Sequence, residues 1–168
     1  ENLGYFTMAI TLLSLPTSLI GNSVSQVLYE HLSTHINNRN LKEINRVLVL
    51  LVITSLFFLI LYFFGELLVI DIALGEKWRS SLKMIYILIP SFMISYVSKP
   101  FERSCYLFGK PKWHIISAFL KLLFISFAIV LSYISNADFY YYVKSYCIAI
   151  SIHYCIDFTY NYYLIVKN

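Results

Sequence analysis

The amino-acid sequence predicts an all-α membrane protein, a polytopic bundle of transmembrane helices that forms one domain over residues 1–168. The chain is 59% hydrophobic and only 13% charged, whereas soluble domains carry about 25% charged residues. Five apolar stretches approach or exceed the roughly 20 residues that cross a bilayer as a helix. Tyrosines cluster at both ends of the last stretch, which is typical of side chains at the headgroup level. A water-soluble fold is excluded, because a chain of this length could not bury so much apolar surface.

The five membrane-spanning segments are expected at residues 3–30, 46–65, 81–108, 113–135 and 139–166. Pro16 should kink or tilt the first segment. Gly109 and Pro111 are typical of the end of the third segment, and the polar residues 135–138 separate the fourth from the fifth. Residues 66–77 are too polar to span but are rich in Leu and Ile, which favours a short interfacial helix.

Lysine and arginine residues predict the orientation of the bundle. Seven of them fall on one side of the five segments and four on the other, and the richer side is expected to be cytoplasmic. The seven are Arg39, Lys42, Arg46, Arg103, Lys110, Lys112 and Lys167, and the four are Lys77, Arg79, Lys83 and Lys144. The C-terminus at Asn168 should therefore lie in the cytoplasm.

Two further lysines, Lys99 and Lys121, are left inside the membrane at similar distances from the turn between the third and fourth segments. Side chains of the third segment near this depth have the spacing of one helical face: Lys99, Glu102, Arg103 and Tyr106. Ionisable groups inside a membrane usually face a bundle interior or a watery cavity. These cations therefore form a site for an anion such as pyrophosphate, or they snorkel and pair with Glu102.

An uncharged polar stripe follows the first segment: Thr7, Thr11, Ser14, Ser18, Asn22, Ser25, Gln26 and Tyr29. Such a stripe either lines a hydrophilic cavity that accepts sugar hydroxyls or joins helices through hydrogen bonds. In the first case Asn22, Ser25 and Gln26 are the candidate substrate contacts.

The fifth segment carries His153 and Asp157 one helical turn apart, which lets a carboxylate orient an imidazole. Such a pair either serves in proton coupling or is a packed polar pair. His31 and His35 also have metal-like spacing, but no third ligand is near them in the sequence, so no metal site is expected.

Other chemical signals are missing from the sequence. It has no phosphate-binding loop, nucleophile elbow or zinc motif, so neither an enzyme nor a cofactor is expected. Its basic residues form no aromatic-interleaved face for nucleic acid. The three cysteines lack CxxC spacing and are expected to be small buried side chains: Cys105, Cys147 and Cys155.

Three stretches together resemble a known family: LPTSLIGNSVSQVLYEHLS at 15–33, ALGEKWRSSLKMIYILIPSF at 73–92 and KPFERSCYLFGKPKWH at 99–114. They are similar to the polysaccharide biosynthesis, or O-antigen flippase, family of the multidrug, oligosaccharidyl-lipid and polysaccharide exporter superfamily. The resemblance implies that the chain is the C-terminal half of an exporter, helices eight to twelve of the second lobe, and that an N-terminal lobe is missing.

In that family, two lobes alternate access to a central cavity and move an undecaprenyl-pyrophosphate-linked oligosaccharide across the bacterial inner membrane. An O-antigen or capsule repeat unit, as in lipopolysaccharide biosynthesis, would be the substrate. The resemblance implies that Lys99, Arg103 and Lys121 meet the pyrophosphate. Membrane lipids, the missing lobe, a glycan polymerase and chain-length proteins are the partners to consider.

Three other functions remain open from the sequence. A multidrug or toxin exporter of the same superfamily would need cavity carboxylates for cations. A membrane-embedded glycan polymerase would usually have a large extracytoplasmic loop. A structural helix bundle would have no transport role.

Overall fold

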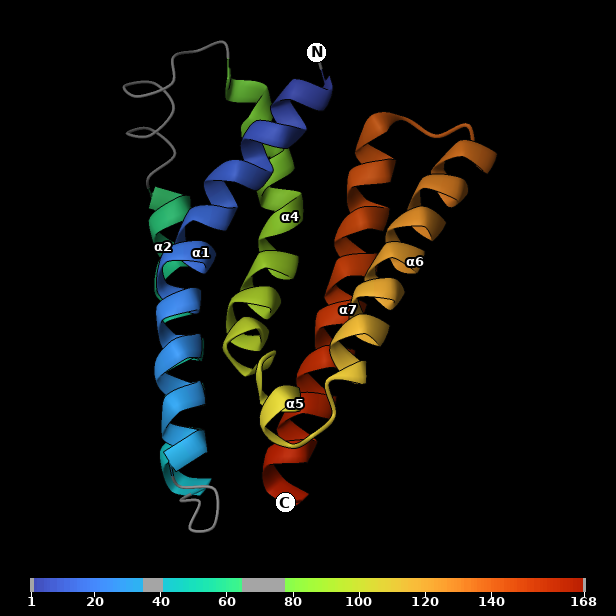
Figure 1. Cartoon of the computed structure of the whole chain (residues 1–168). Helices are drawn as coiled ribbons and strands as arrows, with labels where there is room; N and C mark the ends of the chain where they lie inside the picture. Colours follow the sequence, from blue (N-terminus) through green and yellow to red (C-terminus); the bar gives the residue numbers. More distant parts are fainter. Residues whose placement is uncertain (1, 35–40, 65–77, 168) are drawn as a thin grey trace.

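The computed structural model of the chain describes residues 2–34, 41–64 and 78–167. The regular structure of these residues is entirely helical, which confirms the all-α class (Figure 1). The helices are α1 (Asn2–Thr34), α2 (Leu41–Phe64), α4 (Arg79–Ser98), the 3₁₀ turn η3 (Lys99–Phe101), α5 (Ser104–Leu107), α6 (Lys112–Ile134) and α7 (Phe139–Lys167). The expected interfacial segment 66–77 and the basic residues Arg39 and Lys77 lie outside the described residues.

Four of the expected spans are confirmed by length and composition. Among the described residues, the helical stretches that could cross a membrane are Asn2–Thr34, Leu41–Phe63, Ser80–Leu107 and Lys112–Ile134. Most Leu, Ile, Val and Phe side chains of α2 and α6 are exposed on the bundle surface, as expected where lipid is the solvent. The chain is therefore a membrane protein.

The fifth expected span, α7, begins and ends as predicted but is less apolar than the other four. Its 29 residues would reach about 43 Å at 1.5 Å per residue, which is long enough to cross. It packs against both α4 and α6 and lies between them (Figure 1). Buried polar side chains at His153, Asp157 and Asn161 lower its hydropathy, because this helix buries one face in protein rather than in lipid.

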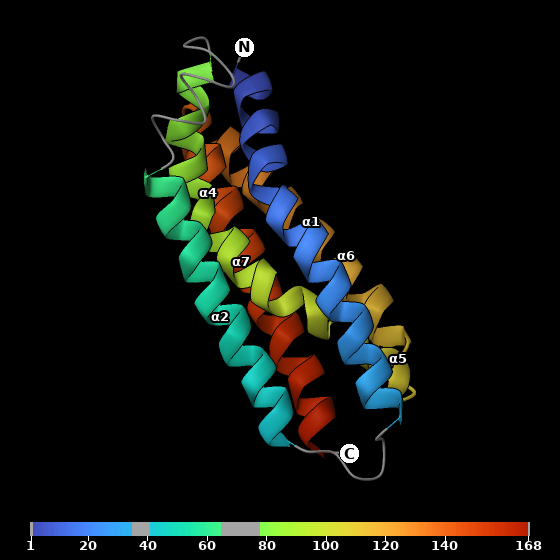
Figure 2. The same ribbon diagram turned by 90° about the vertical axis from the view of Figure 1, so that its left-hand side faces the viewer.

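The bundle core forms around α4, which packs against α1, α2 and α7. Figure 2 shows α1 and α2 nearest the viewer, with α4 and α7 behind and between them. One apolar cluster near the N-terminal end of α1 includes Phe6, Leu13, Met84, Leu88 and Val143. A second, toward the other end, includes Leu28, Ile44, Tyr96, Phe101 and Ile165. The two described ends of the chain lie at opposite ends of the bundle (Figure 1).

The third expected span, 81–108, is not one continuous α-helix. α4 ends at Ser98, and Lys99–Phe101 form a 3₁₀ turn in which the Glu102 N–H donates to Lys99 O at 3.2 Å. Pro100 has no N–H to continue the α-helical pattern, which explains the break. The expected face of Lys99, Glu102, Arg103 and Tyr106 therefore crosses a break in the α-helix. These four side chains are nevertheless less buried than Pro100, Phe101, Ser104 and Cys105 between them.

The two predicted turns of the second half are confirmed. Gly109 has φ +64°, the left-handed conformation that a glycine adopts without a Cβ penalty, and it ends the third span. Asn136, in the α6–α7 turn, has φ 45°, which Asn tolerates better than most residues. Asp138 then accepts a hydrogen bond from the Tyr141 N–H at 3.0 Å and caps the start of α7.

Candidate functional site

A buried polar cluster joins α6 to α7. Trp113 and Ser117 are one turn apart on α6, and His153, Asp157 and Asn161 follow at four-residue intervals on α7. Four-residue spacing places each set in a stripe along one helix face. The two stripes meet because α6 and α7 run antiparallel and pack together.

Asp157 is the centre of this cluster, and three donors bind its carboxylate. Trp113 Nε1–H donates to Oδ1 at 3.0 Å and Ser117 Oγ–H donates to the same oxygen at 2.6 Å. Asn161 Nδ2–H donates to Oδ2 at 3.2 Å. The residue is only 4% exposed, and such charge-assisted hydrogen bonds are what a buried carboxylate requires.

His153 lies in the same cluster with one ring nitrogen bound and the other free. Its Nε2 lies 3.0 Å from the Ser117 carbonyl oxygen and 3.1 Å from Ser117 Oγ. A carbonyl only accepts, so Nε2 carries a proton and donates it to the Ser117 carbonyl oxygen. Nδ1 is buried and has no hydrogen-bond partner among the described residues.

The expected His153–Asp157 pair thus shares a helix face, but Ser117 stands between the two side chains as a bridge. Sequence reasoning missed the other three members of the cluster. Asn161 was signalled by its position one turn after Asp157. The sequence carried no comparable signal for Trp113 and Ser117, because they come from another helix whose rotation is fixed only by packing.

Lys121 lies one turn beyond Ser117 on α6 and contacts Tyr154 of α7. Its Nζ donates to Tyr154 Oη at 3.3 Å and lies 5.3 Å from the ring centroid. Ser98 Oγ–H donates to the Tyr154 backbone carbonyl at 3.3 Å, so the end of α4 meets α7 at this same residue. Tyr154 therefore places Lys121 and Lys99, the residue after Ser98, at a common level of the bundle.

Lys99 is directed to a different helix. It is half-buried, and its Cδ lies 4.0 Å from the position that a Cβ would take on Gly21 of α1. The aliphatic part of the Lys99 side chain thus packs against α1 at Gly21, whereas Lys121 contacts α7. Arg103 is exposed at the start of α5.

Glu102 does not pair with any of these cations. Its Oε1 lies 3.5 Å from His114 Nδ1, without the geometry of a hydrogen bond. No ion pair within 4.0 Å joins Lys99, Arg103 or Lys121 to a carboxylate in the described part of the chain. The pairing with Glu102 that would have made these cations structural is therefore absent from the described ranges.

The polar stripe of α1 divides between two environments. Asn22 and Gln26 are exposed, whereas Ser25 is buried. Hydroxyls nearer the N-terminus donate to carbonyls of their own helix, such as Thr7 to Leu3 O and Thr11 to Thr7 O, both at 2.9 Å. These hydroxyls do not join helices.

The paired histidines and the cysteines lie in different surroundings. His31 Nε2 lies 3.0 Å from Glu43 Oε2, and His35 lies outside the described residues. Within the described ranges no group of three His, Cys, Asp or Glu side chains could hold a metal ion. Cys105 and Cys147 are buried as expected, but Cys155 is exposed, because it lies on the outer face of α7.

Comparison with known proteins gives one match. A family model described as polysaccharide biosynthesis protein matches residues 1–83, which include α1, α2 and the first residues of α4. The stretch 99–114 and the polar cluster lie beyond this match. No curated protein and no solved structure matches the chain. The match supports the resemblance seen in the sequence: residues 1–83 are similar to polysaccharide biosynthesis proteins.

Proposed function

We propose that this chain forms part of an exporter that flips an undecaprenyl-pyrophosphate-linked oligosaccharide from the cytoplasmic to the periplasmic leaflet of a bacterial inner membrane. The family match supports a role in polysaccharide biosynthesis or export, and the membrane-length helices suit a lipid-linked substrate. The observation that carries the proposal is the set of three cations at the η3 end of α4 and on α6, none of which has a carboxylate partner in the described residues.

The energetic argument rests on the two lysines. A lysine at the centre of a membrane helix costs about 2.5–3.5 kcal/mol on insertion scales. Contact with the Tyr154 ring holds the Lys121 ammonium group in place without neutralising it. Lys99 packs its aliphatic stem against Gly21 and has no carboxylate within 4.0 Å among the described residues. A pyrophosphate with several negative charges would offset the cost for both.

In this proposal the exposed polar side chains of α1 bind the sugar units of the substrate. Asn22 and Gln26 carry amides that can donate to and accept from hydroxyl groups, and both are exposed. Ser25, which was grouped with them in the sequence, is buried and is better suited to packing within the bundle.

The environments of Asp157 and Glu102 favour an anionic over a cationic substrate. An exporter of cationic drugs needs a carboxylate open to its substrate. Asp157 already accepts hydrogen bonds from three side chains, and Glu102 lies beside His114. Lys99 and Lys121, by contrast, have no carboxylate partner in the described residues.

The proposal is tested with Lys99→Ala, Lys121→Ala and the double variant in the full-length protein. Lys144→Ala is the matched control, because Lys144 is an exposed lysine of the same bundle that lies far from Tyr154. Loss of one charge-assisted contact, worth about 1.5–3 kcal/mol, should lower export about 10- to 100-fold at equal protein level, and the double variant should export less. Surface glycan is measured together with the lipid-linked repeat units that remain inside the cell.

The same measurement separates the alternatives. Loss of flipping leaves repeat units on the cytoplasmic side, whereas loss of a polymerase displays single repeat units outside. Full export by the double variant would rule out the cationic site.

A further inference from the structure

A proline lies in the middle of α1. Pro16 has no N–H to donate to the carbonyl four residues before it, and its ring crowds that carbonyl. The affected group is the Leu12 carbonyl, inside a helix that continues from Asn2 to Thr34. Within a membrane a carbonyl freed in this way must find another donor, since water is scarce there.

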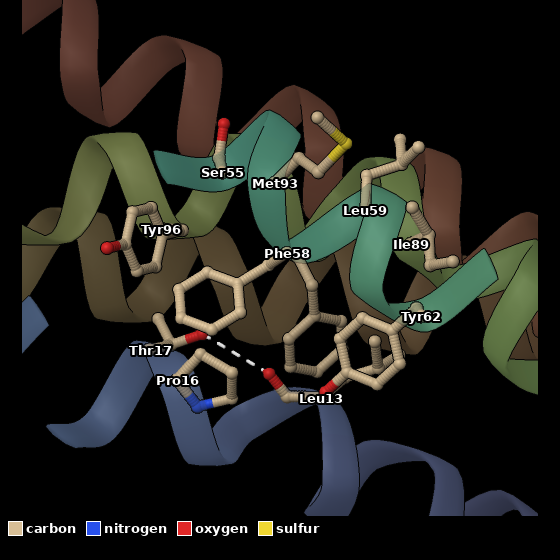
Figure 3. Close-up of a pocket in the computed structure, with 11 residues that line it drawn as sticks. Leu13, Pro16, Thr17, Ser55, Phe58, Leu59, Tyr62, Ile89, Met93 and Tyr96 are labelled. Carbon is tan, nitrogen blue, oxygen red and sulfur yellow. Dashed lines mark hydrogen bonds between the residues drawn. The ribbon is translucent and has the colours of Figure 1, made fainter. Parts of the chain in front are cut away.

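Tyr62 of α2 supplies that donor. Its hydroxyl donates to the Leu12 carbonyl oxygen at 2.7 Å. Figure 3 shows the Tyr62 ring reaching from α2 to the α1 ribbon beside Pro16 and Leu13. The side chain of one helix thus replaces the backbone hydrogen bond that the proline removes from its neighbour.

The packing of α1 beside Pro16 is incomplete. A small cavity of about 30 Å³ lies beside the proline, and its lining includes Leu13, Pro16, Thr17, Phe58, Tyr62 and Tyr96. Thr17 Oγ–H reaches the Leu13 carbonyl at 3.4 Å, a long hydrogen bond. α1 changes direction partway along its length (Figure 1), and the free space beside Pro16 leaves room for the angle between its two parts to change.

We propose that Tyr62 is a positioning residue that sets the bend of α1 at Pro16 and thereby places Asn22 and Gln26. Gln26 lies ten residues beyond the proline, about 15 Å along the helix. A change of about 15° in the bend would move it by about 4 Å on this lever arm. The consequence for transport rests on the proposed function, but the structural role of Tyr62 does not.

A double-mutant cycle tests the structural role in the full-length protein. Tyr62→Phe removes the hydroxyl and keeps the ring, so the melting temperature should fall by about 2–6 °C. Pro16→Ala restores the backbone N–H, so the same Tyr62→Phe change should cost less than half as much in that background. Equal losses in both backgrounds would overturn the proposal.

Tyr96→Phe is the matched control, because Tyr96 lines the same cavity. Its hydroxyl lies 3.2 Å from Thr54 Oγ1, and Thr54 also reaches the Leu50 and Leu51 carbonyls. Removal of this hydroxyl therefore leaves no proline-freed carbonyl unpaired. A Tyr96→Phe loss that equals the Tyr62→Phe loss, and that also shrinks in the Pro16→Ala background, would overturn the assignment.

A distance measurement reports the bend itself and does not depend on how Pro16→Ala folds. Spin labels at Leu3 and Val27, which are 67% and 68% exposed, lie on either side of Pro16. Tyr62→Phe should broaden or shift their distance distribution, and Tyr96→Phe should not. An unchanged distribution in Tyr62→Phe would contradict the proposal.

Transport is measured on the same variants. Lower glycan export by Tyr62→Phe than by Tyr96→Phe, at equal protein level, supports a role of the bend in transport. A changed distance distribution with full export would overturn that role. Failure of the proposed function itself would appear separately, as export that does not depend on Lys99 and Lys121.

Discussion

Asp157→Ala should strongly destabilise the packing of α6 on α7. The substitution leaves three donors without their carboxylate: Trp113 Nε1–H, Ser117 Oγ–H and Asn161 Nδ2–H. A buried donor that loses its partner costs about 1–3 kcal/mol. The sum is about 3–9 kcal/mol if nothing relaxes. At about 2–4 °C per kcal/mol for a chain of this size, the melting temperature should fall by at least about 6 °C.

The assay is thermal unfolding of the full-length protein in detergent, followed by tryptophan fluorescence because Trp113 is in the cluster. Thr159→Ala is the control on the same helix, since its hydroxyl donates only to the Cys155 carbonyl at 2.7 Å and its side chain is exposed. That change should stay within about 0.5 kcal/mol. Asp157→Asn keeps an oxygen for Trp113 and Ser117, so it should lie between the two. An Asp157→Ala shift as small as that of Thr159→Ala would refute the account of the cluster.

Three further outcomes are expected. A cysteine at Asn136, in the α6–α7 turn, should react with an impermeant maleimide in intact cells while one at Lys110 is protected; the reverse labelling would invert the orientation. Of the native cysteines in the described ranges, Cys155 should react first with a membrane-permeant maleimide, because Cys105 and Cys147 are buried. Faster labelling of Cys147 than of Cys155 would contradict the rotation of α7. If protons drive transport through His153 Nδ1, which has no partner among the described residues, then Asp157→Asn and His153→Gln should each flatten the pH dependence of export. Lys144→Ala should leave that dependence unchanged. Normal pH profiles in both variants would show that His153 and Asp157 serve only in packing.

The helices were predictable because their signal is local. Apolar runs of membrane length, ended by Gly109 and by the polar residues 135–138, sufficed to place the spans within a few residues. The end of the third span was predicted incorrectly, because the expected continuous helix to residue 108 stops at Ser98. A proline is tolerated in many membrane helices, so the sequence did not show which proline would end one. In the structure Pro100 lies inside the 3₁₀ turn that replaces the α-helix.

The site was predictable only where its residues come from one helix. The spacing of His153 and Asp157 placed them on a common face, but their bridge through Ser117 depends on how α6 is rotated against α7. The neighbour of Glu102 was also missed. His114, whose Nδ1 lies 3.5 Å from Glu102 Oε1, comes from the next helix, whereas the sequence offered only Lys99, Arg103 and Lys121 as partners. The fifth span was predicted at residues 139–166 although α7 is less apolar than the others, because its polar face is buried in protein.

The most direct test of the proposed export function is a flipping assay with purified full-length protein in liposomes. A fluorescent undecaprenyl-pyrophosphate-linked oligosaccharide is placed in both leaflets, and an impermeant reductant quenches the label on the outside. Flipping should expose the inner pool, so that fluorescence is lost almost completely with the wild-type protein and markedly more slowly with the Lys99→Ala, Lys121→Ala double variant. Retention of half the fluorescence, as in protein-free liposomes, would contradict the proposal that this helix bundle moves a lipid-linked glycan.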